Sequence, residues 1–99
     1  MPGYLWAGGL LGASGSKVST TGQVVWSVAR TGTGLYTITY TTGHPGGGVN
    51  YIINVTGHAS LACVRGAAYV TNTSFQVATY TLGTATSADS NFCFMVLAS

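Results

Sequence analysis

A strict two-residue alternation runs through residues 35–41. Tyr36, Ile38 and Tyr40 occupy every second position, and threonines stand between them. Successive side chains of a β-strand point to opposite faces, so this pattern predicts a strand with one aromatic face and one hydroxyl-bearing face. We expect the three apolar side chains to lie in a core.

Similar runs recur along the chain with clusters of Gly, Ser and Asn between them, and no helical pattern of useful length occurs. The further expected strands are residues 23–30, 49–56, 61–70, 74–81 and 91–97. Gly66 interrupts one of them, which predicts a β-bulge or two short strands. The whole pattern favours an all-β fold, a jelly-roll-like antiparallel β-sandwich.

The length of 99 residues allows one domain with a single hydrophobic core. We expect a head domain over residues 17–99. Residues 1–21 should hold a first strand, around residues 4–7, and then a flexible loop rich in Gly and Ser. The apolar stretch 4–13 is about half the length of a membrane helix and no charged segment precedes it, so neither membrane insertion nor a signal peptide is expected. The abrupt beginning suggests a piece of a longer protein.

The last expected strand is apolar on both faces. It alternates Phe92, Phe94 and Val96 with Cys93, Met95 and Leu97. An exposed edge strand of this kind would aggregate, so it belongs in the middle of a sheet or against a neighbouring subunit. We therefore regard Phe92, Phe94 and Met95 as markers of an assembly strand.

Charge is almost absent from the chain. Charged residues make up 4% of it, against about 25% in an average soluble domain. An apolar share of 46% excludes disorder, yet a monomer with so few charges should be poorly soluble. We expect identical copies to cover much of the surface, because obligate interfaces resemble a domain core cut in half. The three cations are scattered and form no basic stripe, so nucleic acid is not an expected partner.

The sequence contains few side chains that could act as catalytic acids or bases. Asp89 is the single side-chain carboxylate, and it lies in a polar turn where Asp commonly accepts hydrogen bonds from backbone N–H groups. No G-x-S-x-G motif is present, so we expect neither an enzyme nor a cofactor. His58, Cys63 and Cys93 could be written as zinc ligands, but their spacing matches no zinc motif. We expect the cysteines to be buried thiols, although one disulfide between them is permitted.

Aromatic rings and short hydroxyls could bind a sugar without charge. His44 and Asn50 bracket a glycine-rich loop that we expect to be an exposed tip, where recognition residues commonly lie. Tyr4 and Trp6 are further candidates for ligand contact. Asn72 begins an N-glycosylation acceptor sequence at a strand boundary and is the candidate glycosylation site.

Part of the chain is similar to a known class of proteins. The run from Val28 to Tyr40 (V-A-R-T-G-T-G-L-Y-T-I-T-Y), the pair His44-Pro45 and the closing strand resemble C-terminal head modules of attachment and fibre proteins from large algal viruses and tailed phages. A related motif occurs in the wider trimeric jelly-roll class of complement and tumour-necrosis-factor type. The likeness extends from about Lys17 to the end of the chain, with Tyr40 where the pattern usually has Phe.

Heads of this class are typically homotrimers at the tip of a stalk. The resemblance implies a homotrimeric fibre head on a virion surface, or alternatively an extracellular protein. It further implies attachment to a host-surface receptor, with a glycan as the expected ligand. The alternative is a purely structural trimerisation or capsid-decoration module that binds no receptor.

Overall fold

The computed structural model describes residues 4–45, 51–57, 62–81 and 87–98, which form eight β-strands and no helix. The strands are β1 (Tyr4–Leu11), β2 (Lys17–Gly22), β3 (Trp26–Gly32), β4 (Leu35–Tyr40), β5 (Ile53–Gly57), β6 (Ala62–Ala68), β7 (Ser74–Thr81) and β8 (Phe92–Ala98). Within these ranges there is no helix of the length and apolarity needed to cross a membrane.

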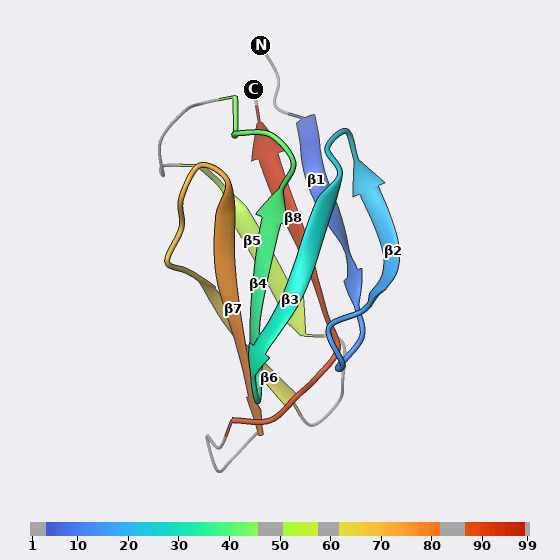
Figure 1. The fold of residues 1–99 in the computed structure, drawn as a ribbon, viewed down its shortest axis with the longest axis vertical. Helices are drawn as coiled ribbons and strands as arrows, with labels where there is room; N and C mark the ends of the chain where they lie inside the picture. Colours follow the sequence, from blue (N-terminus) through green and yellow to red (C-terminus); the bar gives the residue numbers. More distant parts are fainter. Residues whose placement is uncertain (1–3, 46–50, 58–61, 82–86, 99) are drawn as a thin grey trace.

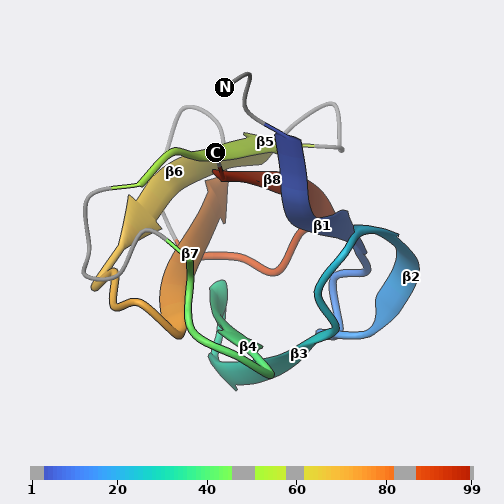
Figure 2. The ribbon, with the colours of Figure 1, turned by 90° about the horizontal axis from the view of Figure 1, so that it is seen from above.

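The strands form two four-stranded antiparallel sheets that lie face to face (Figure 1). The first sheet has the order β2-β1-β8-β5, and the second has the order β3-β4-β7-β6. Figure 2, which looks along the strands, shows the two layers separately, with β5 and β6 close together on one side. The fold is therefore a jelly-roll-like antiparallel β-sandwich, as the sequence predicted.

The core fills the space between the sheets with aromatic rings. Trp26 and Phe94 meet edge to face with centroids 4.8 Å apart, and Phe75 and Phe94 do so at 5.4 Å. Tyr36, Ile38 and Tyr40 of β4 are all buried, which confirms the alternation expected for that strand. Such aromatic pairs stabilise a core beyond the apolar area that they bury.

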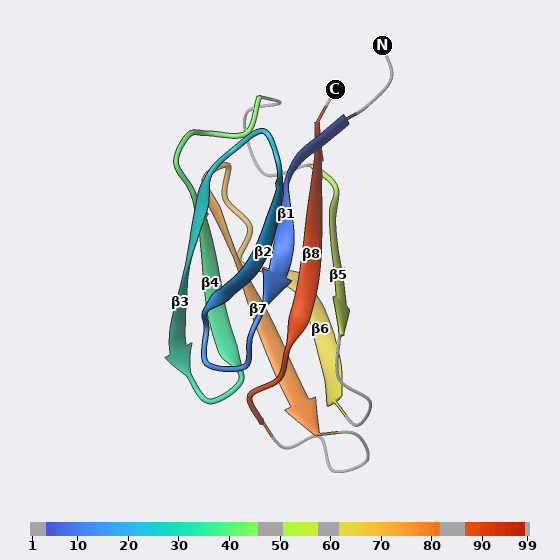
Figure 3. The same cartoon turned by 90° about the vertical axis from the view of Figure 1, so that its right-hand side faces the viewer.

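The last strand lies in the middle of the first sheet, between β1 and β5 (Figure 3). Phe92, Phe94 and Val96 are buried, whereas Met95 and Leu97 are exposed on the outer surface. Of the two placements that the sequence left open, the central one is therefore confirmed. On the outward side of the strand, Met95 and Leu97 remain exposed in the single chain.

The N-terminal segment differs from expectation. The predicted strand continues to Leu11, and residues expected to be a flexible loop form β2, which pairs with β1. All six residues of β2 are exposed, so its sequence carries no buried alternation that could have revealed it. Gly9 permits the close approach of neighbouring groups, because a Cβ at that position would overlap the Trp26 ring and lie 2.5 Å from the Ser19 carbonyl oxygen.

The other boundaries deviate by a few residues. β3 begins at Trp26, three residues later than predicted. Of the predicted strand 49–56, residues 51 and 52 precede β5, and residues 49 and 50 lie outside the described residues. The β6–β7 pairing shifts its register between Arg65 and Ala68, which confirms the bulge predicted at Gly66.

Candidate functional site: an apolar sheet face

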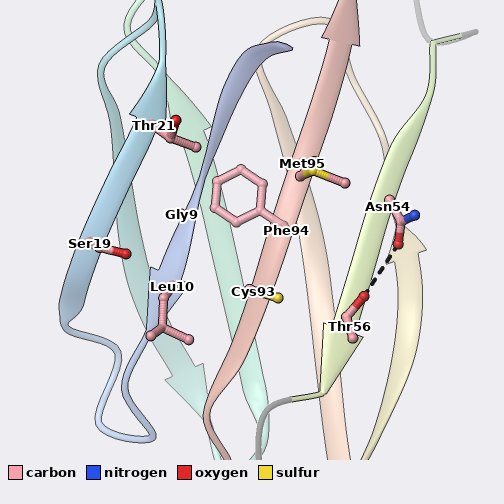
Figure 4. Close-up of a pocket in the computed structure, with 9 residues that line it drawn as sticks. All are labelled: Gly9, Leu10, Ser19, Thr21, Asn54, Thr56, Cys93, Phe94 and Met95. Atoms are coloured by element: carbon pink, nitrogen blue, oxygen red, sulfur yellow. Dashed lines mark hydrogen bonds between the residues drawn. The ribbon is translucent and has the colours of Figure 1, made fainter.

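The outer surface of the first sheet is organised in rows of directly paired residues. Two rows cross all four strands, Ser19–Leu10–Cys93–Thr56 and Thr21–Gly8–Met95–Asn54. Figure 4 shows the stick-drawn side chains of these rows on adjacent strands. Apolar or small residues occupy the two central strands, and hydroxyl or amide side chains occupy the two edge strands.

Further apolar side chains extend this surface towards the chain ends. Met95 is 45% exposed, Leu97 36% and Ile52 64%. We call the outward surface the apolar face and define it by Gly8, Leu10, Ile52, Cys93, Met95 and Leu97, with Ser19, Thr21, Asn54 and Thr56 beside them. Isolated exposed hydrophobic residues are ordinary, but a contiguous group of them marks an interaction site.

The apolar face is hollowed at its centre. A groove of about 240 Å³ lies there. Its lining residues are Gly9, Leu10, Ser19, Thr21, Asn54, Thr56, Cys93, Phe94 and Met95. Gly8 contributes to the shape, because a Cβ there would lie 2.9 Å from the Phe94 carbonyl oxygen and 3.1 Å from Thr21 Cγ2.

No residue of the apolar face is charged. Among the described residues of the first sheet, Lys17 carries the one charge, and its Nζ lies 4.7 Å from the centre of the Trp26 ring. A cation over an aromatic face is attracted by the ring quadrupole. The first sheet therefore presents an outer surface that water solvates poorly.

The second sheet presents a different outer surface. Tyr36, Ile38 and Tyr40 point inward, so Thr37 and Thr39 of the same strand point outward. The neighbouring strands add Ser27, Ser74 and Gln76 at paired positions. These hydroxyl and amide groups can hydrogen-bond to water, although Leu35 at the end of β4 is also partly exposed. We call this outer surface the hydroxyl face.

Two expected ligand contacts lie in the interior instead. His44, which we expected on an exposed tip, is 6% exposed, and Trp6 is 3% exposed. The His44 ring stacks on Tyr51 at 4.1 Å, meets Trp6 at 4.9 Å and donates from Nε2 to the Leu97 carbonyl at 2.8 Å. The expectation of an exposed His44 was wrong, because these aromatic contacts fold the loop's first residues onto the sandwich.

Hydroxyl groups connect this interior cluster to the β6–β7 turn. Tyr51 Oη donates to the Thr71 carbonyl at 2.6 Å, so the Tyr40 hydroxyl, 3.1 Å away, donates to Tyr51 Oη. Burial raises the pKa of both phenols, most strongly that of Tyr40. Both phenols therefore keep their protons at neutral pH and act as structural hydrogen-bonding groups.

The remaining candidates divide between surface and undescribed residues. Tyr4 is 37% exposed at the start of β1, and Asn50 lies outside the described residues. Asn72 is half-buried, and its backbone carbonyl accepts a hydrogen bond from His44 N at 2.7 Å. Among the described candidates, no hydrogen bond or ring contact joins Tyr4 to Asn72.

The titratable groups of the described residues form no catalytic or metal constellation. Asp89 Oδ1 accepts from Gly34 N at 2.7 Å and Oδ2 lies 2.8 Å from the Arg30 guanidinium. The carboxylate thus accepts a backbone N–H as expected, but from the distant β3–β4 turn and not from the segment in which it lies. The Arg30 hydrogen bond, followed by that of Gly34 N, lowers the pKa of the Asp89 carboxyl. No group of three His, Cys, Asp or Glu could hold a metal ion in this part of the chain.

The structure describes the side chain of one of the two cysteines. Cys93 is a free thiol, half-buried on the apolar face, so the expected full burial was wrong for this residue. The side chain of Cys63 and the whole of His58 lie outside the described part of the structure, as do the corresponding expectations.

Comparison with protein-family models, with curated proteins and with solved structures found no match to this chain.

Proposed function

We propose that this chain is a homotrimeric assembly module, the head of a fibre on a virion surface, and that its apolar face is the subunit interface. The observation that carries the proposal is the uncharged, grooved outer surface of the first sheet. In a protein with four charged side chains, this surface carries no charge and exposes the side chains of Ile52, Met95 and Leu97.

An interface of ordinary size would cover a modest share of the surface of one chain. A standard protein–protein interface buries about 800 Å² per partner, roughly a seventh of the 5306 Å² that one chain exposes. Burial of apolar surface contributes about 25 cal/mol per Å², so covering Ile52, Met95 and Leu97 favours association by several kcal/mol before entropy losses. The same contact removes from water the area that would make a monomer insoluble.

The sequence resemblance supports the trimer and the fibre, and the structure supports association independently. Host attachment through a glycan has weaker support, because Trp6 and His44 are buried and cannot offer their ring faces to a sugar. The assembly part of the proposal therefore stands separately from the attachment part. A screen of the purified protein on a glycan array tests attachment.

Sedimentation equilibrium at micromolar concentration tests assembly. We expect a species of three times the 10.1 kDa chain mass. The variant Met95→Glu places a charge on the apolar face at a half-exposed position, so it should remain folded and sediment as a monomer. Thr39→Glu places the same charge on the hydroxyl face and should remain trimeric. A wild-type monomer, or a trimeric Met95→Glu variant, would overturn the proposal.

A further inference from the structure

A trimer requires two different surfaces on each copy. Around a threefold axis every contact is heterologous, so the apolar face of one subunit cannot meet the same face of the next across a twofold axis. This inference rests on the proposed function. In such a trimer, a second surface of each chain must face the groove of the neighbouring copy.

We infer that the second surface is the side of the sandwich where β2 and β3 stand unpaired. We call it the flank and define it by Val18, Thr20, Val24 and Val25. β2 ends the first sheet and β3 ends the second, and no pairing joins them. Figure 2 shows β2 at the outside of the molecule on this side.

The flank carries the remaining strongly exposed aliphatic side chains of β2 and the β2–β3 connection. Val18 is 61% exposed and Val25 is 66% exposed. Ser19 and Thr21 line the groove of the apolar face, so Val18 and Thr20, which alternate with them, point away from it. Lys17 adjoins the flank, because it lines one pocket with Thr20, Val24 and Val25, and its ammonium lies over the Trp26 ring. The four residues that define the flank are uncharged.

The other described surfaces fit water better than a hydrophobic groove. The hydroxyl face presents Thr37, Thr39 and Gln76, whose side chains can hydrogen-bond to water. The end of the molecule near the β3–β4 turn carries the Arg30–Asp89 ion pair, which would be costly to desolvate in an interface. We therefore assign the flank, where Val18 is 61% and Val25 66% exposed, as the apolar partner for the apolar face.

Dimensions and backbone chemistry agree with this arrangement. A six-residue strand such as β2 extends about 20 Å, and the apolar face from Cys93 to Leu97 extends about 17 Å, at roughly 3.4 Å per residue. Beyond Lys17 at its start, the exposed edge of β2 is uncharged, and such an edge is a site of unwanted pairing unless something covers it. In the ring that we infer, each copy's groove covers the next copy's β2 edge.

Mixing two interface variants tests the arrangement. Val18→Glu disables the flank and Met95→Glu disables the apolar face. Each variant alone should sediment as a folded monomer, with circular dichroism like that of the wild type. Mixed one to one, they should form a heterodimer of twice the chain mass and no larger species, because the intact flank of one variant meets the intact face of the other. Thr39→Glu is the control and should remain trimeric.

The outcomes separate this inference from the proposed function. If Met95→Glu is monomeric while Val18→Glu still assembles, the proposed interface holds and the flank is wrong. If both are monomeric but their mixture gives no heterodimer, the flank does not meet the face. A monomeric wild type would remove the proposed function itself. Val25→Glu, in the connection after β2, replaces Val18→Glu if the strand variant does not fold, and the same outcomes apply to it.

Discussion

Removing one oxygen atom from Tyr36 should destabilise the sandwich out of proportion to its size. The Tyr36 side chain is fully buried, and its hydroxyl joins three segments. It donates to the Ala13 carbonyl in the β1–β2 turn at 2.7 Å and accepts from Ser90 N, ahead of β8, at 3.2 Å. Burial raises the pKa of this phenol, so it remains a donor at neutral pH. The substitution Tyr36→Phe removes both bonds and keeps the ring.

The expected loss follows from the burial of the two partners. Loss of the bond to the half-buried Ala13 carbonyl, which water can reach, costs about 1 kcal/mol. Loss of the buried bond to Ser90 N leaves an unpaired donor and costs about 1–3 kcal/mol. The sum of about 2–4 kcal/mol is a large part of the 5–15 kcal/mol that stabilises a typical domain.

Urea denaturation at pH 7 and one fixed protein concentration measures this loss. The fixed concentration matters because an oligomer's stability depends on it. Tyr69→Phe is the matched control, since that side chain is 82% exposed, and it should change the free energy of unfolding by less than about 0.5 kcal/mol. If Tyr36→Phe matches this control with an unchanged denaturant slope, the hydroxyl does not hold the three segments together.

Three further changes probe the core, the ion pair and the sheet. Phe94→Asp puts a charge at a 2% exposed position and should give insoluble or unfolded protein; a soluble fraction with native circular dichroism would contradict the assigned core. The lowered pKa of Asp89 stabilises the fold above the ordinary carboxyl range, so wild-type stability should fall as the pH drops below about 4 towards the folded pKa. An Asp89→Asn variant, which lacks that carboxyl, should show a flatter acid limb in denaturation at stepped pH; parallel limbs would refute the assignment. Gly9→Ala should lower the melting temperature by several degrees because its methyl group overlaps the Trp26 ring, whereas Gly12→Ala, which meets the flexible Ser16 side chain at 3.0 Å, should cost less.

Alternation in the sequence was sufficient to predict the strands whose two faces differ in environment. Tyr36, Ile38 and Tyr40 are buried because one face of β4 meets the core and the other meets water. The apolar character of both faces of β8 limited it to the middle of a sheet or to a contact with another subunit, and the structure shows the central position. The alternation of apolar and polar residues is informative because it shows which side chains are buried, and the two packed sheets bury those same side chains.

The sequence signal failed where local pattern and tertiary contacts disagree. β2 has no buried residue, so nothing in its Lys, Val, Ser and Thr sequence separates it from a loop. His44 precedes Pro45 and a glycine run, which favours an exposed loop, yet stacking on Tyr51 and the bond to Leu97 draw it inside. The Leu97 carbonyl is distant from His44 in the sequence, and Tyr51 is one of several tyrosines in the chain. No local pattern could have indicated either contact.

The outer surfaces of the two sheets differ in polarity, so the two sides of the sandwich are not equivalent. Hydration of a chain with so few charges has to come from neutral groups, and Thr37, Thr39 and Gln76 place them on the second sheet. The first sheet offers Leu10, Met95 and other apolar groups instead, although the same strand alternation could have placed hydroxyls there. A monomer gains nothing from that difference, because water contacts both sides equally. An assembly with the first sheet inside and the second outside accounts for both surfaces at once, and it requires the charge of any Glu variant to be tolerated on one sheet and rejected on the other.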